Sequence, residues 1–499
     1  MPRFVSALAL VVTTASFAAA QRASVPGAMS RIRTEDLRRD LHYLAGDDFR
    51  GREGGTLDEM RASMWIADQL KAIGVEPMGD NGTYFQWFGL RRTRIGASSV
   101  VTVGLRTFTM WSDIAATSNG PAEVSAPTIW VSDVTDTTLD IRGKVVIAQL
   151  RPPPQRGRQT SVNSPEYRYA NSAIQNTGVA LTRRGAAAVI LVADETAEIG
   201  FQGVANIRSR GSYALDGAPA GLGGGGRGNA QSPAPVLLVR RAMLDELRQE
   251  GKLATIRLFR ESFIYPSVNI VGRIRGTDAR LRDEYVLFSS HQDHDGVRYD
   301  VAGDSIWNGA DDNGTTSVAL LAIARAFKAQ PGRRSALFVY HGAEERGLLG
   351  SRYHSATPVV PLSNIVAVLN GDMLGRNHPD SASIMGVQPP HLNSSELVSM
   401  ALAANTATGK FALDSIWDRP THPENWYFRS DHLPYARLNV PALFFSSNLH
   451  PDYHTPRDEP ETIDYAKLTR ITQWMYLTGW LVATTEKRPA LVPGFRLER

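Results

Sequence analysis

The chain has 499 residues, and 42% of them are hydrophobic, which excludes a globally disordered protein and suggests two or three domains. The net charge of +4 is small and the basic residues are dispersed, which argues against nucleic-acid binding. The chain has no cysteine, so metal sites must be built from His, Asp and Glu, and nucleophiles from Ser, Thr or water.

The first twenty residues have the pattern of a secretory signal peptide. Arg3 precedes the short apolar run FVSALALVV, and Ala18 and Ala20 occupy the A-x-A positions of a cleavage site. We therefore expect a signal peptide over 1–20 and export to the periplasm or the extracellular space. The alternative is an uncleaved N-terminal anchor. No later run of about 18 apolar residues follows, so we expect no stable membrane insertion of the mature chain.

The remaining chain divides into three segments by its hydrophobic pattern. Residues 30–97 begin with two amphipathic patterns, 33–46 and 57–74, and each of them ends in glycine, which predicts two helices. Residues 98–262 contain short β-branched runs such as GKVVIAQL, which predict a β-rich inserted module. The glycine tract 221–228 lacks a following GK[ST], so we interpret it as a surface loop and not as a phosphate loop.

Residues 263–488 alternate between apolar strand patterns and amphipathic helices. The predicted strands are SVNIVGRI, EYVLFSS, SALFVYHG, IVAVLNGD and VPALFFSS, and the predicted helices cover 317–330, 395–409 and 465–485. Such alternation is typical of an α/β domain with a mostly parallel central sheet flanked by helices.

Ionisable residues follow four of these strands, and two more precede a helix. They are His291 and Asp293 in HQDHDG, Asp311 and Asp312 in NGADDNGTT, Glu344 and Glu345 in HGAEER, Asp372 in LNGD, and His454 in DYHTP. Because sites in open α/β sheets form at the carboxyl ends of strands, we expect these groups to meet at one edge. So many carboxylates need a compensating cation, and His with carboxylates suits Zn²⁺, Mn²⁺ or Co²⁺.

The spacing of these residues suggests roles. His291 and Asp293 lie two residues apart at a strand end, so His291 can bind a metal while Asp293 accepts its other ring N–H. Glu344 and Glu345 are adjacent and point in different directions, so one can be a ligand and the other a general base. An odd number of carboxylates allows one to bridge two metals about 3.5–4 Å apart.

Five motifs in order resemble those of the M28 zinc metallopeptidases. They are HQDHDG, NGADDNGTTSVALLAIA, GAEERGLLGSRYH, LNGDMLGR and DYHTPRDEP. The similarity extends upstream to LHYLAGDDFRGREGG, and IRGKVVIAQL with ALTRRGAAAVILV resembles a protease-associated (PA) domain. The resemblance implies a zinc-peptidase/phosphorylase-like fold with an inserted, β-rich PA-like domain.

The resemblance also implies a role for each matching residue. His291 and Asp372 would hold one zinc ion, Glu345 and His454 would hold the other, and Asp312 would bridge the two. Glu344 matches the general base, Asp293 the residue that orients the first histidine, and Tyr453 a tyrosine that stabilises the oxyanion. Three further histidines near the motifs, His294, His354 and His378, are interpreted as surface or supporting groups. His341 occupies a position where a Thr-like residue is expected. Asp431 and His432 are interpreted as structural supports.

The function expected from these observations is that of a secreted di-zinc aminopeptidase acting on peptide substrates. A carboxypeptidase, a dipeptidase or a monozinc glutaminyl cyclase on the same fold are alternatives, because specificity depends on loops such as 377–395 and 412–430 and not on the motifs. A peptidase-like binding protein without catalysis is the alternative of another class. No nucleic-acid partner is expected, and the oligomeric state is left open.

Overall fold

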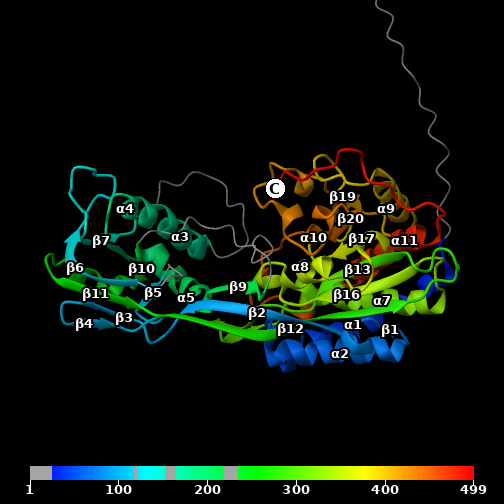
Figure 1. Ribbon diagram of the computed structural model, residues 1–499, viewed down its shortest axis with the longest axis horizontal. Coiled ribbons are helices and arrows are strands. Elements are labelled where there is room, and N and C mark those ends of the chain that lie inside the picture. The colour runs from blue at the N-terminus through cyan, green and yellow to red at the C-terminus, as the bar shows by residue number, and fades with distance from the viewer. Residues whose placement is uncertain (1–24, 117–121, 152–164, 218–233, 499) are drawn as a thin grey trace, which may run out of the picture.

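A computed structural model describes residues 25–116, 122–151, 165–217 and 234–498, and these form two lobes side by side (Figure 1). The predicted signal peptide 1–20 and the glycine tract 221–228 lie outside the described residues. No described helix combines the length and the apolar character that crossing a bilayer requires.

The larger lobe is built on a mixed sheet. Its described strands follow the order β19 (Ala412–Leu413), β18 (Ser381–Met385), β20 (Ala442–Ser446), β17 (Ile365–Gly371), β13 (Tyr285–His291), β16 (Ser335–His341), β12 (Arg260–Ile274), β2 (Phe85–Ile95) and β9 (Ser212–Leu215), and β1 (Glu76–Pro77) also pairs with β12. The five predicted strands correspond to β12, β13, β16, β17 and β20. The prediction of an α/β domain is thus confirmed for the class of fold and for these five strands.

At the centre of this sheet the four strands β16, β13, β17 and β20 run in one direction, and at one edge β18 and β19 also pair parallel. The expectation of a mostly parallel sheet is wrong for its two sides, where β12 is antiparallel to β16 and β18 is antiparallel to β20. On the side of β12, the chain path makes a further pair antiparallel. β2 leaves toward the second lobe and β12 returns from it, so these two strands pair antiparallel without a helical crossover.

Helices cover both faces of the central strands. One face packs against α1 (Thr34–Leu44), α2 (Leu57–Ile73), α7 (Thr316–Ala329), α9 (Ser395–Ala407) and α11 (Tyr465–Thr484). The other face packs against α10 (His432–Arg437), and α8 (Leu349–Ala356) lies beside it. Almost every residue of α7 is buried, which explains why its sequence is apolar nearly all round.

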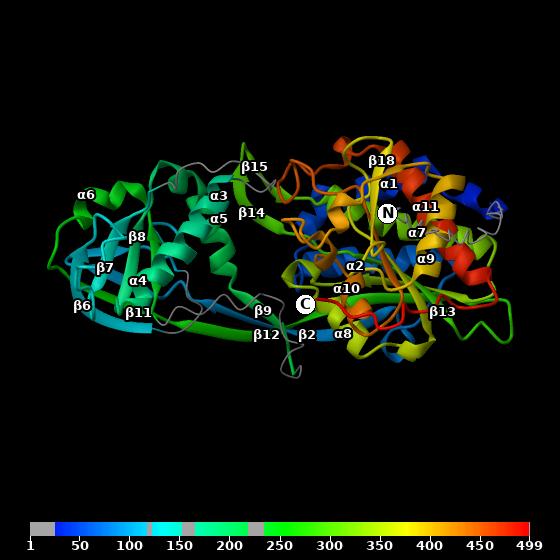
Figure 2. The ribbon, with the colours of Figure 1, turned by 90° about the horizontal axis from the view of Figure 1, so that it is seen from above.

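The second lobe has its own sheet and its own core. The described strands follow the order β4 (Arg106–Phe108), β3 (Val100–Val103), β11 (Leu253–Leu258), β6 (Ala122–Trp130), β7 (Val145–Gln149), β8 (Ala188–Val192), β10 (Val236–Val239) and β5 (Ile114–Ala116). Its helices are α3 (Pro165–Ala173), α4 (Val179–Arg183), α5 (Glu195–Arg210) and α6 (Leu244–Leu247). Figure 2 shows the hairpin of β14 (Gly296–Val301) and β15 (Asp304–Trp307) lying between this lobe and the larger one.

Gly479 of α11 lies in the core of the larger lobe, where neighbouring side chains leave no space for a Cβ atom. A Cβ atom at this position would lie 2.7 Å from Cε1 of Phe288, and the Phe288 ring is fixed by stacking on Phe338 at a centroid distance of 5.5 Å. Gly479→Ala should therefore destabilise the protein by about 1–3 kcal/mol, although alanine is the better helix former. Calorimetry should give a lower melting temperature than wild type, whereas Gln473→Ala on the same helix should change it little. A Gly479→Ala protein as stable as wild type would contradict this packing.

Candidate metal centre

The predicted site residues meet at the carboxyl edge of the parallel strands. β13 ends at His291, β17 leads directly into Asp372, and β16 leads through a short turn into Glu344 and Glu345. Asp312 lies in the irregular turn Ala310–Thr315 before α7. His454 comes from the segment after β20 and has a positive φ of 51°. The five predicted ligands, four that follow strands and one that precedes a helix, therefore lie at one edge of the sheet.

A first group of metal-binding atoms consists of His291, Asp312 and Asp372. One donor atom from each of the three lies within 4.8 Å of the others, and all three residues are buried. Nε2 of His291 is 3.3 Å from Oδ1 of Asp312 and 3.5 Å from Oδ2 of Asp372. Ser430 donates a 2.7 Å hydrogen bond to Oδ2 of Asp372 and so fixes that carboxylate.

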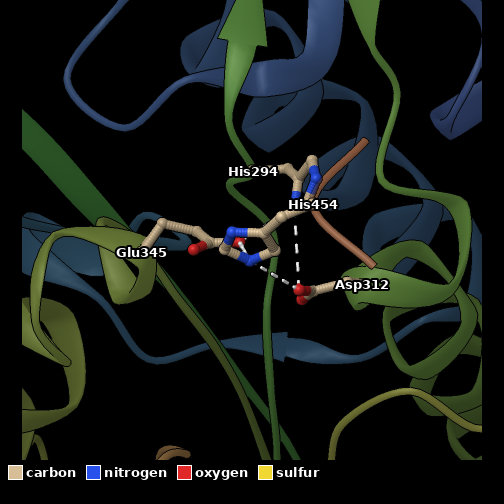
Figure 3. A group of neighbouring side chains, drawn as sticks. All are labelled: His294, Asp312, Glu345 and His454. Atoms are coloured by element: carbon tan, nitrogen blue, oxygen red, sulfur yellow. Dashed lines mark hydrogen bonds and ion pairs between the residues drawn. The ribbon is translucent and has the colours of Figure 1, made fainter. Parts of the chain in front are cut away.

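A second group consists of His294, Asp312, Glu345 and His454, and Figure 3 shows their side chains converging. Nε2 of His454 is 3.0 Å from Oδ2 of Asp312 and 3.0 Å from Oε1 of Glu345. Nδ1 of His294 is 2.9 Å from the same Glu345 oxygen. Asp312 belongs to both groups, with one oxygen toward each, which is the geometry of a bridging ligand.

The donor atoms of both groups fit divalent cations. Nε2 of His291, both ring nitrogens of His294 and Oε1 of Glu345 are buried and make no hydrogen bond within the described structure. Buried polar atoms without partners are costly unless something else satisfies them. Burial opposes protonation of His454, yet the carboxylates of Glu345 and Asp312 raise its pKa to about 9, which reflects the negative charge of the cluster.

Glu344 lies beside the first group without belonging to it. Its Oε2 is 3.8 Å from Nε2 of His291, and it lines a cavity next to the cluster. Burial raises the pKa of the Glu344 carboxyl well above its ordinary value; His291 opposes the rise, and the carboxylates of Asp431 and Glu345 add to it. A carboxyl group with a raised pKa at the edge of a metal cluster is suited to accept and return a proton.

Asp293 contacts His291 through its backbone oxygen and not, as we expected, through its carboxylate. Nδ1 of His291 lies 3.1 Å from the backbone oxygen of Asp293, whereas the carboxylate is 3.9 Å away. The carboxylate instead accepts the backbone N–H groups of Glu344 at 2.9 Å and Glu345 at 3.3 Å. Asp293 therefore fixes the turn that carries both glutamates, because a carboxylate so close to two N–H donors is turned toward them and away from the imidazole.

Two buried groups hold the loops of the centre in place. Arg52 donates to the backbone oxygens of four residues, at 2.7 to 3.0 Å: Leu44, Gln292, Asn308 and Gly309. Asp458 accepts the backbone N–H groups of Asp311 at 2.9 Å and Asp312 at 3.0 Å. These hydrogen bonds connect three loops that follow strands, namely those that contain Gln292, Asp312 and Asp458, and they do so without a metal.

The sequence suggested that His294 is a surface or supporting residue, and the structure differs. Its side chain is fully buried and lies in the second donor group. Asp295 was missed as well: its Oδ2 is 3.2 Å from Nδ1 of His454, so it orients that ring. The signal was present in HQDHDG, where His294 and Asp295 continue the run of ionisable residues.

The other histidines near the motifs lie outside both groups. His378 is exposed, as expected. His354 and His341 are buried around the hydroxyl of Tyr435, at 2.6 Å and 3.4 Å. Asp431 and His432 are fully buried at the start of α10, in the supporting position expected of them.

Tyr453 lies over the second group. Its ring is 3.9 Å from that of His454, centroid to centroid, and its hydroxyl oxygen accepts a 3.0 Å hydrogen bond from Arg429. The phenolic O–H thus keeps its own proton for a further acceptor.

The chain is similar to known peptidases in sequence and in fold. The family model of peptidase family M28 matches residues 269–478. Aminopeptidase YwaD of Bacillus subtilis (strain 168) is 26% identical over 268 residues, which span about half of each chain, 52% of this one and 53% of the relative.

Solved structures extend the likeness in fold to nearly the whole chain. The aminopeptidase from Aneurinibacillus sp. strain AM-1 has a TM-score of 0.54 at 18% identity, with 93% of this chain and 97% of that chain covered. BSAP, a zinc aminopeptidase from Bacillus subtilis, has a TM-score of 0.56 at 18% identity, with 95% and 100% covered. The match over residues 269–478 contains the strand-end cluster described above, and over these residues the chain is similar to peptidase family M28.

Proposed function

We propose that this chain is a zinc-dependent aminopeptidase that removes N-terminal residues from peptides. One observation carries the proposal: two groups of buried donors share Asp312, with Glu344 directly beside them. Imidazole and carboxylate donors without sulfur suit zinc. The aminopeptidase names of the relatives support the exopeptidase class.

The proposal places two zinc ions in each chain. His291 and Asp372 would hold one, Glu345, His454 and His294 the other, and Asp312 both. His294 is added to the expected ligands because its Nδ1 is as close to Glu345 as the His454 ring is. Zinc at such a site polarises a carbonyl group and lowers the pKa of water toward neutrality.

The chain's own residues supply the proton transfer and the charge stabilisation. Glu344 would take a proton from the attacking water and return it to the leaving amine. The hydroxyl of Tyr453 would donate to the oxyanion, because Arg429 already occupies its oxygen as a donor. Asp293 would keep Glu344 in position through the backbone of the turn.

We further propose the domain bounds and the destination that the sequence suggests. Residues 98–262 would form a PA-like inserted domain between the two parts of the peptidase domain, 30–97 and 263–488. The separate sheet and core of the second lobe support this division. The signal-peptide pattern of 1–20 supports export to the periplasm or beyond.

Glu344→Gln should lower kcat on an aminoacyl 4-nitroanilide by about 100-fold or more, because the glutamine amide cannot accept the proton. Zinc content, measured by plasma mass spectrometry, should stay at the wild-type value because Glu344 lies outside both donor groups. Turnover at the wild-type rate would refute the role of general base. Loss of zinc along with activity would make Glu344 a ligand instead.

Blocking the substrate amine should abolish hydrolysis if the enzyme is an aminopeptidase. A peptide amide and its N-acetyl form can be compared by chromatography of the products, with the cleaved bond identified by mass. We expect cleavage of the first peptide bond of the free form and none of the acetylated form. Release of the C-terminal residue from a free-acid acetylated peptide would favour the carboxypeptidase alternative.

His294→Ala should weaken zinc binding, because it removes one of four donors from the second group. We expect an affinity at least about tenfold lower at one of two sites, measured by competition with a chromophoric chelator. The matched control is His378→Ala, which removes an exposed imidazole close in sequence to the cluster. Equal affinities in the two variants would show that His294 is no ligand.

A further inference from the structure

A cavity of about 390 Å³ opens beside Glu344. Leu348, Phe428 and Leu433 form its apolar wall, and Tyr453 lines it together with Glu344. Its volume lies within the range of about 300–1,000 Å³ that is usual for small-ligand sites. A group bound here would be next to the scissile bond of a substrate in the proposed peptidase.

Three arginines line this cavity, and each comes from a different element. Arg352 lies on α8, Arg437 ends α10, and Arg429 follows the turn Trp426–Phe428. Arg429 is paired with Glu424 at 2.9 Å. We call Arg352, Arg429 and Arg437, with the cavity they line, the arginine pocket.

The other two arginines have no acidic partner. Across the described ranges, neither Arg352 nor Arg437 forms an ion pair within 4.0 Å, although most arginines of the larger lobe do. Nε of Arg352 is buried and makes no hydrogen bond there. Burial, and then the positive charge of Arg437, lower the pKa of Arg352, so the two guanidinium groups are close enough to repel each other.

A second cavity on the opposite side of the cluster differs in character. It measures about 360 Å³, reaches His454, and is lined largely by apolar and aromatic side chains such as Ile199, Tyr299 and Trp307. The two cavities would therefore receive different parts of a peptide. The uncompensated positive charge is found on the Glu344 side.

We propose that the arginine pocket binds a carboxylate of the peptide substrate, an inference that rests on the proposed peptidase function. The carboxylate is either an Asp or Glu side chain beside the scissile bond or the free C-terminus of a short peptide. Guanidinium groups bind carboxylates by paired, charge-assisted hydrogen bonds, and a neutral group would leave Arg352 and Arg437 repelling each other. The same pocket repels the side chains of Lys and Arg.

A rival explanation is that these arginines only offset the negative charge of the metal cluster. That role makes no distinction between substrates: replacing an arginine would change the hydrolysis of acidic and neutral peptides by the same factor. If the pocket binds a carboxylate, replacing an arginine changes kcat/KM for the acidic peptide of a matched pair by a larger factor than for the neutral peptide. The ratio of kcat/KM within a pair therefore separates the two explanations.

The test uses zinc-loaded full-length protein and two matched pairs of peptides. Leu-Glu-amide with Leu-Gln-amide reports a side-chain carboxylate, and Leu-Leu with Leu-Leu-amide reports a terminal carboxylate. We expect wild type to prefer the acidic member of one pair by about tenfold or more in kcat/KM, and the pair that shows it identifies the source. Arg437→Gln and Arg352→Gln should each reduce that ratio several-fold.

Arg437 is exposed, so its replacement by glutamine should leave the fold intact, and Arg260→Gln at the exposed start of β12 is the matched control. Ratios near one in wild type for both pairs, or ratios unchanged in both pocket variants, would overturn the proposal. If no peptide is hydrolysed, the proposed function fails instead. The pocket is then judged by calorimetric binding of both pairs of peptides, and equal affinities of wild type for the two members of each pair would overturn it.

Discussion

The Asp312 carboxylate lies between two histidines that are 163 positions apart in the chain, His291 and His454, and the organisation of the centre depends on this contact. Burial and the neighbouring Glu345 oppose its ionisation, yet the adjacent imidazoles of His291 and His454 hold the pKa of Asp312 below its ordinary value. An ionised carboxylate with one oxygen toward each group is what two cations can share. Asp458, which accepts the Asp312 backbone N–H, fixes the backbone that carries this carboxylate.

Further buried arginines support the centre from outside. Asp295, which orients His454, forms an ion pair with Arg298 of β14 and another with Arg346 at 3.5 Å. Arg210 of α5 donates to the backbone oxygen of Asp295 at 2.9 Å. Arg210 thus connects the second lobe to Asp295, and through Asp295 the orientation of His454 depends on both lobes.

The sequence was sufficient for the parts of the fold that depend on local pattern. The glycine at the end of the pattern 57–74 predicted the end of α2, and Gly74 has the positive φ of 84° that such an ending requires. The strand-end rule also predicted that the residues after the parallel strands lie close together, because parallel strands necessarily bring their carboxyl ends to one edge.

What sequence reasoning could not give is the direction of side chains in irregular turns. HQDHDG contains three ionisable residues in a row after Gln292, and nothing local decides that His294 turns toward Glu345 or that Asp293 turns toward two N–H groups. The arginine pocket was hidden for another reason. Its members lie on three elements at positions 352, 429 and 437, and only the packing of α8 against α10 brings the first and the last together.

The long ladder between β2 and β12 joins the two lobes. Eleven registered residue pairs run without interruption from Phe85 and Ile270 to Ile95 and Arg260. Ile199 of α5 and His454 come one from each lobe, and they line the same cavity. In the proposed peptidase, a substrate that reaches His454 through this cavity would lie between the two lobes and contact both of them.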